Sequence, residues 1–255
     1  MKKIAQFLLN KIPRPMLINL SIALRPITDF WFQGKQFTDP INGKSYRKFL
    51  PYGYGKQRAN ALSPGTLSLE RHRQMWLFLQ NETDFFTKNY RVLHIAPEQE
   101  FFRRFRKMKN IDYVSADLFS PIVDVKADVR DLPFEDNSFD VVFCNHVLEH
   151  IEDDATAMNE IFRVMKRGGW GILQVPMKNS LLETYEDFTI TNPKERQKHF
   201  GQYDHVRWYG LDYFQRLEKA GFRVDANQYS QQFSDEDITK YGLNKNEYLP
   251  IVYKE

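Results

Sequence analysis

The chain of 255 residues has the composition of an ordinary globular protein, with 42% hydrophobic and 27% charged residues. Its net charge of +3 is too small to indicate nucleic acid as a partner by itself. The single cysteine, Cys144, excludes an internal disulfide and fits a reducing compartment, so we expect a cytoplasmic protein.

Residues 1–33 are apolar with scattered basic residues, and we expect an amphipathic helical segment there. Asn10 and Lys11 interrupt the apolar start, which argues against a signal peptide. The next apolar stretch, Met16 to Leu24, is too short to span a bilayer. The favoured interpretation is a helix that packs on the protein or on a dimer mate. The alternative is peripheral membrane contact through residues 1–24, which would make the protein membrane-proximal.

Residues 34–87 form the second expected segment, a small module with a leading helix. Closely spaced glycines and prolines in residues 34–66 predict turns and short strands. Apolar residues at helical spacing from Leu67 onward predict the helix.

Residues 88–255 form the third segment, in which short apolar runs alternate with helical patterns, as in a parallel sheet covered by helices. The expected strands are residues 91–96, 113–116, 123–127, 141–144, 170–175, 222–229 and 248–253. Helices are expected at residues 155–166, ending at Gly168-Gly169, and at residues 211–220. The intervening stretch 177–209 is long for a connection, which is typical of a lid or binding loop.

Small or polar residues follow four of these strands, at the edge where open α/β sheets bind ligands. They are Ala96-Pro97-Glu98, Asp117, Asp128 and Asn145-His146, in strand order. A carboxylate at Asp117 can accept both ribose hydroxyls of a nucleoside. A carboxylate at Asp128 can accept an adenine amino group while the Val129 N–H meets a ring nitrogen. The four positions together predict a nucleoside site.

The stretch from Asp128 to Ile151 resembles the D-x-x-x-LPF-x-D-x-SFD-V-V-x-x-x-x-VLEH run of class I S-adenosylmethionine-dependent methyltransferases of type 11. Glu160 to Gly169 is similar to the E-x-x-RVLKPGG that follows in that family. The resemblance covers about residues 88–255. It implies a Rossmann-like α/β fold with a mostly parallel seven-stranded sheet of order 3-2-1-4-5-7-6, helices on both faces and a small N-terminal appendage.

The resemblance also implies S-adenosylmethionine as cofactor and methyl transfer to an unidentified acceptor, which we expect to be a small molecule, a glycan or a lipid-linked compound. It implies that Asp117 binds the ribose, that Asp128 binds the adenine and that Asn145 lies beside the methionine part. The residues expected to bind the cofactor are His94, Ala96, Pro97, Glu98, Asp117, Leu118, Asp128, Val129, Asn145 and His146.

The turn after the first strand departs from the family, whose first motif is usually D-x-G-x-G-x-G. Here the turn carries His94-Ile-Ala-Pro-Glu, and Ala96 stands where the first glycine would be. One interpretation is a divergent subfamily that retains the cofactor, which the presence of Asp117 and Asp128 favours. The other is a catalytically inactive binding protein that keeps the methyltransferase fold.

Residues 37–79 resemble the N-terminal zinc ribbon of a methyltransferase subgroup, with the pattern C-P-x-C-G-K and later CP-x-CGSLERHR. The four ligand positions of that pattern carry Asp39, Asn42, Ser63 and Thr66 in this chain. Because no thiolate is left, we expect no structural zinc there. Basic residues interleave with tyrosines in this module, so an RNA methyltransferase is a further alternative, which the mild net charge does not favour.

His146-x-x-Glu149-His150 matches the H-x-x-E-H spacing of inverted zinc proteases. The match lies inside the VLEH run of the methyltransferase family, which explains it without a metal. We therefore expect no metal there, a packed role for His150, and a place for His146 facing the cleft.

A methyltransferase receives its methyl group already activated, so the protein mainly positions the reactants and supplies a base for a hydroxyl or amine acceptor. His146 and His205 are the candidate bases. His205 lies in the run Asp204-His-Val-Arg-Trp-Tyr209, which resembles a family H-x-R-x-(F/Y) run near the active-site mouth. The alternative for this run is a loop-anchoring ion pair with Asp204. The residues expected to bind the acceptor are Arg207, Tyr209 and Arg71.

Overall fold

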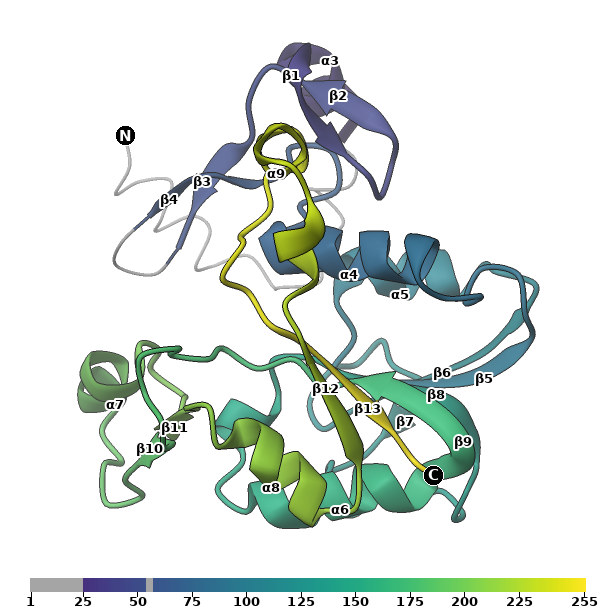
Figure 1. Cartoon of the computed structure of the whole chain (residues 1–255), viewed down its shortest axis with the longest axis vertical. Coiled ribbons are helices and arrows are strands. Elements are labelled where there is room, and N and C mark those ends of the chain that lie inside the picture. The colour runs from purple at the N-terminus through teal and green to yellow at the C-terminus, as the bar shows by residue number, and fades with distance from the viewer. Residues whose placement is uncertain (1–24, 54–56) are drawn as a thin grey trace. The chain divides into compact units, whose positions relative to one another are not determined.

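The computed structural model describes residues 25–53 and 57–255 (Figure 1). The chain divides into two compact units. Among the described residues, the smaller unit contains those up to Arg73 together with Asp235–Leu243, and the larger contains Gln74–Ser234 and Asn244–Glu255. The two units therefore divide between Arg73 and Gln74, whereas the expected segments end at residues 33 and 87, and these expected bounds stay a prediction. The packing or membrane helix expected within residues 1–24 lies outside the described residues.

The smaller unit consists of short elements, as the density of glycine and proline predicts. Its strands form two antiparallel pairs, β1 with β2 and β3 with β4. A small apolar core gathers Phe37, Tyr46 and Phe49. The elements are α3 (Arg25–Phe32), β1 (Gln33–Asp39), β2 (Lys44–Tyr46), β3 (Leu50–Tyr52), β4 (Arg58–Leu62) and α9 (Asp235–Tyr241).

The larger unit is built on one sheet with the order β12-β13-β9-β8-β5-β6-β7. All neighbouring strands are parallel except β13, which is antiparallel to both β9 and β12. When these seven strands are numbered by their order along the chain and read across the sheet from β7, the order is 3-2-1-4-5-7-6. The predicted fold class is therefore confirmed. The strands are β5 (Tyr90–Ile95), β6 (Ile111–Asp117), β7 (Val125–Lys126), β8 (Phe139–Cys144), β9 (Met165–Ile172), β12 (Arg223–Asn227) and β13 (Leu249–Tyr253).

Helices cover both faces of this sheet, with α5 on one face and α6 and α8 on the other (Figure 1). The long stretch 177–209 contains a short antiparallel pair and a helix rather than an irregular loop. The remaining elements are α4 (Glu70–Asn81), α5 (Gln99–Phe105), η1 (Leu148–His150), α6 (Asp154–Val164), β10 (Tyr185–Glu186), α7 (Pro193–Phe200), β11 (Arg207–Trp208), α8 (Tyr213–Lys219) and η2 (Tyr229–Gln232). Across the two described ranges, no helix has the length and apolar character that crossing a bilayer requires.

The helix predicted for residues 155–166 ends earlier, at Val164, and strand β9 begins directly after it. The two glycines therefore lie beyond the end of the helix, and the expectation that they stop it is wrong. They lie in an irregular part of β9, where the Gly168 N–H donates to the Lys254 carbonyl at 2.7 Å and the Lys254 N–H donates to the Gly169 carbonyl at 3.1 Å. Gly168 adopts a φ of +75°, which only glycine adopts without cost.

Candidate functional site

The carboxyl ends of β5, β6 and β8 meet at one edge of the sheet, because the three strands are parallel and adjacent. Ile95 is in register with Ala116 of β6 and with Cys144 of β8. The next residues along the three strands are the predicted ligand positions Ala96, Asp117 and Asn145. Asp128 lies two residues beyond β7, the next strand along the sheet. The strand ends predicted to form the nucleoside site are thus brought to one edge.

The turn after β5 is held by the buried ring of His94. Its Nε2 lies 2.8 Å from Oε2 of Glu98, and its Nδ1 lies 3.0 Å from the hydroxyl of Tyr113. The ring is fully buried and both nitrogens are engaged, so His94 holds the turn in place, and its contact with a cofactor stays a prediction. Ala96 has a φ of +48°, in the left-handed region that glycine occupies readily. The backbone therefore keeps a glycine-like turn although the glycine itself is absent.

Asp117 ends β6 and shapes the loop after it. Its Oδ1 accepts hydrogen bonds from the backbone N–H groups of Phe119 at 2.7 Å and Ser120 at 2.6 Å. The side chain of Leu118 is 38% exposed and that of Phe119 is 84% exposed. Apolar groups beside a carboxylate are suited to covering a nucleoside base while the carboxylate binds its ribose. Phe119 was not predicted, although its place directly after a polar strand end was a usable signal.

Asp128 is engaged by an arginine two residues along the chain. The Arg130 side chain donates from Nη2 to Oδ2 at 2.7 Å and from Nε to Oδ1 at 3.1 Å. The hydrogen bonds from Arg130 hold the pKa of the Asp128 carboxyl below its usual value, so the group is a carboxylate at neutral pH. A base bound here would share this carboxylate with an exposed arginine. The side chain of Val129 is buried, which leaves only its backbone for ligand contact.

Asn145 and His146 follow β8 and are fixed by Gln174, which lies just after β9. The Gln174 N–H donates to Oδ1 of Asn145 at 3.3 Å, and the His146 N–H donates to the Gln174 carbonyl at 2.7 Å. The Nδ2 of Asn145 lies 3.4 Å from the Met75 sulfur. His146 has a φ of +54°, a strained conformation for a non-glycine residue and one that clusters at functional sites. Nothing in the sequence indicated the role of Gln174.

Glu149 and its neighbouring imidazoles form what we call the Glu149 cluster, made of Glu149, His146, His150 and His205. Oε1 of Glu149 lies 3.2 Å from Nδ1 of His146 and 4.0 Å from Nε2 of His150. The His150 and His205 rings meet edge to face, with centroids 4.8 Å apart. Glu149 is 1% exposed. Burial alone would raise the pKa of its carboxyl, but the three imidazoles outweigh burial and the pKa is lowered.

His205, one of the two predicted bases, is buried within this cluster. Burial lowers the pKa of its imidazole, and its Nδ1 lies 3.1 Å from the Phe200 carbonyl. His146 alone follows one of the strands whose ends meet at the edge, and we retain it as the candidate base. His150 is partly exposed rather than fully packed, with 29% of its side chain exposed.

Arg207 and Tyr209, predicted to bind the acceptor, lie in the interior instead. The Arg207 guanidinium donates to the carbonyls of Ile151 at 2.6 Å and Glu152 at 2.8 Å, and it pairs with Glu186 at 2.7 Å. The Tyr209 hydroxyl donates to Asp154 at 2.7 Å. These contacts tie β11 to the end of η1 and the start of α6. Acceptor binding by these two residues stays a prediction, since spacing in the sequence did not show that their side chains point inward.

Arg71, the third predicted acceptor ligand, lies in the first turn of α4 and is partly buried. Its Nε atom is buried and has no hydrogen-bond partner among the residues that the structure describes. No contact of the described chain assigns it a structural role, and acceptor binding stays a prediction for this residue.

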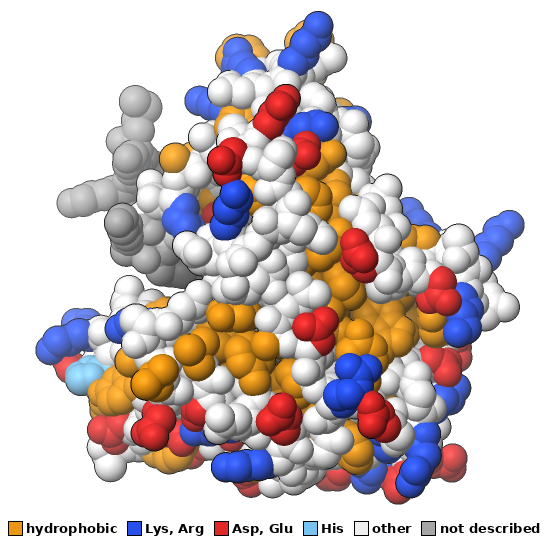
Figure 2. Space-filling model, viewed as in Figure 1, with side chains coloured by type: hydrophobic (Ala, Val, Ile, Leu, Met, Phe, Trp, Pro, Cys, Tyr) orange, Lys and Arg blue, Asp and Glu red, His pale blue; other side chains and the backbone are white. Residues whose placement is uncertain are grey.

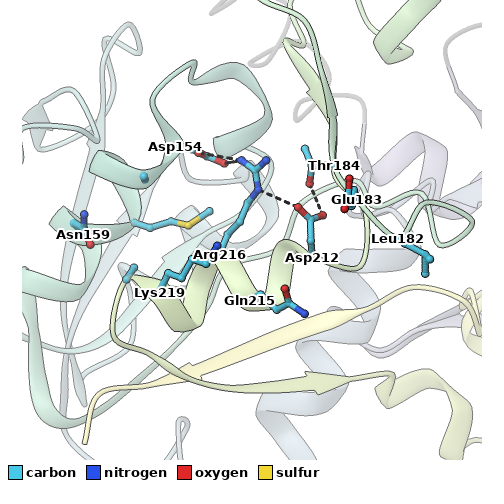
Figure 3. Close-up of a pocket in the computed structure, with 12 residues that line it drawn as sticks. Asp154, Asn159, Leu182, Glu183, Thr184, Asp212, Gln215, Arg216 and Lys219 are labelled. Carbon is cyan, nitrogen blue, oxygen red and sulfur yellow. Dashed lines mark hydrogen bonds and ion pairs between the residues drawn. The ribbon is translucent and has the colours of Figure 1, made fainter.

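A cavity of about 700 Å³ lies between α6 and α8 (Figure 3). Arg216 crosses it and pairs with Asp154 at 3.1 Å and with Asp212 at 3.3 Å, while Thr184 donates to Asp212 at 2.7 Å. None of the residues predicted to bind the cofactor lines this cavity. Its charged groups already neutralise one another, so the strand edge remains the stronger candidate for a cofactor site.

The smaller unit holds a second buried carboxylate, Asp39, at one of the former zinc-ligand positions. Asp39 is fully buried and accepts hydrogen bonds from the Ile41 N–H at 2.9 Å, the Ser68 hydroxyl at 3.2 Å and the Thr66 hydroxyl. Buried Arg73 donates to the Ser68 carbonyl at 2.7 Å. We call Asp39, Thr66, Ser68 and Arg73 the Asp39 cluster. The expected ligand positions 39 and 66 thus meet, and hydrogen bonds join them.

The other two former ligand positions lie near this cluster. Asn42 donates to the Tyr46 hydroxyl at 2.9 Å. Ser63 is buried, and its hydroxyl accepts from the Gly65 N–H at 3.4 Å. On the larger unit, Figure 2 shows basic and acidic side chains intermixed over the viewed face, rather than the broad basic surface that typifies nucleic-acid binding.

Comparison with known proteins adds to this geometry. Residues 80–173 match the family model described as a methyltransferase domain. An uncharacterized protein of Methanocaldococcus jannaschii is 46% identical over 66 residues, which are 25% of this chain and 29% of that protein. The ubiquinone/menaquinone biosynthesis C-methyltransferase UbiE of Idiomarina loihiensis is 32% identical over 69 residues, 26% of this chain and 28% of that protein. These alignments span less than a third of the curated relatives' length.

Among solved structures, an S-adenosylmethionine-dependent methyltransferase from Mesorhizobium loti superposes with a TM-score of 0.48 at 15% identity, covering 70% of this chain and 96% of that one. The likeness concerns the fold. Residues 80–173 thus match a methyltransferase domain, and the strand order of the larger unit is the one that the resemblance to class I S-adenosylmethionine-dependent methyltransferases implies.

Proposed function

We propose that this protein transfers a methyl group from S-adenosylmethionine to a nucleophilic acceptor, with the cofactor bound at the carboxyl edge of β5, β6 and β8. The observation that carries the proposal is the register of these strands. It sets Ala96, Asp117 and Asn145 next to one another at the edge where parallel α/β sheets bind nucleotides.

The residues at this edge suit a nucleoside with a charged tail. The recorded hydrogen bonds to Asp117 all reach Oδ1, so Oδ2 is suited to accept from ribose hydroxyls. Asp128 supplies a carboxylate for the adenine amino group, and the exposed rim of Leu118 and Phe119 supplies apolar cover. Asn145, fixed by Gln174, supplies an amide for the amino-acid part.

The cofactor supplies an activated methyl group on a positively charged sulfur, so no protein nucleophile is required. The chain has to hold the acceptor in line with that methyl group and to exclude water. When the acceptor is a hydroxyl or an amine, a base must take its proton. We assign that role to His146, whose backbone is held at the strand end by Gln174 and whose Nδ1 lies 3.2 Å from Glu149.

We infer that the acceptor is a small molecule, a glycan or a lipid-linked compound rather than RNA. The intermixed charges on the viewed face of the larger unit support this inference, because RNA binding depends on a continuous basic surface. We assign acceptor binding to neither Arg207 nor Tyr209, since interior contacts already engage both side chains.

Calorimetric titration of the full chain with S-adenosylmethionine and S-adenosylhomocysteine tests the proposal. The matched variants are Asp117→Asn, at the carboxyl end of β6, and Asp112→Asn, near the amino end of the same strand and 70% exposed. We expect saturable binding that Asp117→Asn weakens at least about tenfold, because it removes charge-assisted hydrogen bonds to the ribose. Asp112→Asn should bind normally. Absence of binding in the unaltered protein would favour a non-catalytic protein with this fold.

A further inference from the structure

The Glu149 carboxylate is buried among imidazoles and accepts no hydrogen bond of good geometry, although Nδ1 of His146 lies 3.2 Å from its Oε1. Both of its oxygens lack a hydrogen-bond partner among the described residues, although the side chain is 1% exposed. A buried carboxylate that accepts no good hydrogen bond is unfavourable unless a cation lies beside it. A chain that keeps such a group at this position has a use for its negative charge.

The groups facing this carboxylate are imidazoles. One ligand atom each from Glu149, His150 and His205 lies within 4.8 Å of the other two. A zinc ion at its usual bond lengths holds its ligand atoms about 3.3 Å apart, so small side-chain movements would bring the three atoms to an ion. Two imidazoles and one carboxylate are a donor set that first-row transition metals prefer.

Backbone carbonyls orient both imidazoles toward this space. Nδ1 of His205 lies 3.1 Å from the Phe200 carbonyl, and Nδ1 of His150 lies 3.2 Å from the Asp204 carbonyl. A carbonyl can only accept, so Nδ1 carries the proton in each ring and Nε2 keeps its lone pair. This is the outer-shell arrangement found around metal-binding histidines, where the carbonyl fixes the tautomer and the ring orientation.

We propose that Glu149, His150 and His205 form a binding site for one divalent first-row transition-metal ion of the zinc class. The ion joins η1 to the segment that runs from Phe200 to His205. These two parts of the chain are already held together by the backbone hydrogen bond from the Val206 N–H to the Glu149 carbonyl, at 2.9 Å. The partly exposed His150 gives the ion a route from solvent.

This ligand set differs from the one that the H-x-x-E-H spacing suggests. That spacing would place His146 and His150 on one metal, whereas the methyltransferase resemblance explained the same residues without an ion. In the structure, the second imidazole beside Glu149 and His150 comes from His205, far along the chain. His146 is turned by its strained backbone, and its Nδ1 rather than Nε2 faces Glu149.

The test uses the full-length protein stripped of metal by a chelator and then titrated with Co²⁺, whose visible absorption reports the ligand field. The ligand variants are His150→Gln and His205→Gln. The matched control is His199→Gln, which removes a partly exposed imidazole that lies near Glu195 and Tyr185 instead. Circular dichroism and S-adenosylhomocysteine binding report whether each variant is folded, independently of the metal.

We expect one Co²⁺ per chain, displaced by Zn²⁺, with binding weakened at least about tenfold by each ligand variant and unchanged by His199→Gln. Should His205→Gln fail to fold, His150→Gln decides the question, since His150 is the more exposed ligand. Absence of saturable binding in the unaltered protein would overturn the proposal. So would undiminished binding by folded His150→Gln, or an equal loss in His199→Gln.

Discussion

Two buried carboxylates, one in each compact unit, have opposite surroundings. Asp39 accepts hydrogen bonds from a backbone N–H and two hydroxyls, and a buried arginine lies close to it. Glu149 accepts none among the described residues and faces imidazoles instead. Two of the positions that resemble zinc ligands, Asp39 and Thr66, thus belong to a hydrogen-bond network formed by protein groups alone. The segment expected to be free of metal has the character of a metal site.

A pattern of potential ligands in the sequence predicts a metal site less well than the hydrogen bonding of each buried polar atom does. A carboxylate that already accepts three hydrogen bonds from protein donors has little capacity left for an ion. A carboxylate without donors needs a cation, which the protein or the solvent must provide. Predictions that separate the two clusters follow from this difference.

We expect the largest change in the free energy of unfolding from a substitution of Arg73 in the Asp39 cluster. Arg73 is fully buried and donates to the carbonyls of Tyr241 at 2.6 Å, Gly242 at 2.7 Å and Ala61 at 3.0 Å. Arg73→Met leaves these carbonyls and the Asp39 charge without their partner, and should lower the free energy of unfolding by about 3–5 kcal/mol in urea. Arg58→Met, which removes an exposed pair with Glu70, should cost less than about 1 kcal/mol. Equal losses would contradict the network described here.

Metal addition should stabilise the protein through the Glu149 cluster alone. Zn²⁺ at 100 times its dissociation constant should raise the free energy of unfolding by about 2.7 kcal/mol, because it binds the folded state. Asp39→Asn should keep this response, and His150→Gln should lose it. The measurement is urea unfolding with and without Zn²⁺. A response that survives in His150→Gln would place the ion elsewhere.

In metal-free protein, neutralising Asp39 should lower the free energy of unfolding more than neutralising Glu149. Asp39→Asn leaves buried hydroxyl and N–H donors with a poorer acceptor and should cost about 1–3 kcal/mol in the free energy of unfolding. Glu149→Gln removes both the cost of burying a charge and its attraction to the imidazoles, and because these oppose each other it should change that energy by less than about 1 kcal/mol. A larger loss for Glu149→Gln than for Asp39→Asn would mean that the imidazoles already satisfy Glu149.

The smallest expected effect concerns one donor of the Asp39 cluster. Ser68→Ala removes the hydroxyl 3.2 Å from Asp39, the longest of its three hydrogen bonds, and should cost about 1 kcal/mol in urea unfolding. Ser138→Ala removes a comparable but exposed hydrogen bond to the Glu135 carbonyl and should stay within about 0.5 kcal/mol. If both changes are neutral, Asp39 does not depend on Ser68.

The sequence predicted the sheet well because buried parallel strands are short apolar runs followed by polar residues. Residues such as Asp117 and Asn145 could be placed because a strand end fixes where its next side chain lies. The end of α6 was predicted wrongly because a pair of glycines can either end a helix or lie in an irregular strand. The backbone hydrogen bonds with Lys254 place these glycines in a strand, and the sequence does not show that pairing. The Glu149 cluster was missed because His205 is far from Glu149 in the sequence. The path of the chain through β10, α7 and the following turn brings the two residues together.

Hydrogen exchange of the full chain with and without S-adenosylhomocysteine would locate the bound cofactor. We expect slower amide exchange confined to the turns after β5, β6 and β8, which carry Ala96, Asp117 and Asn145. Protection of residues 182–184 and 212–220, which line the cavity between α6 and α8, would place the cofactor there. That result, or no protection at saturating ligand, would contradict the claim that the strand edge is the methyl-transfer site.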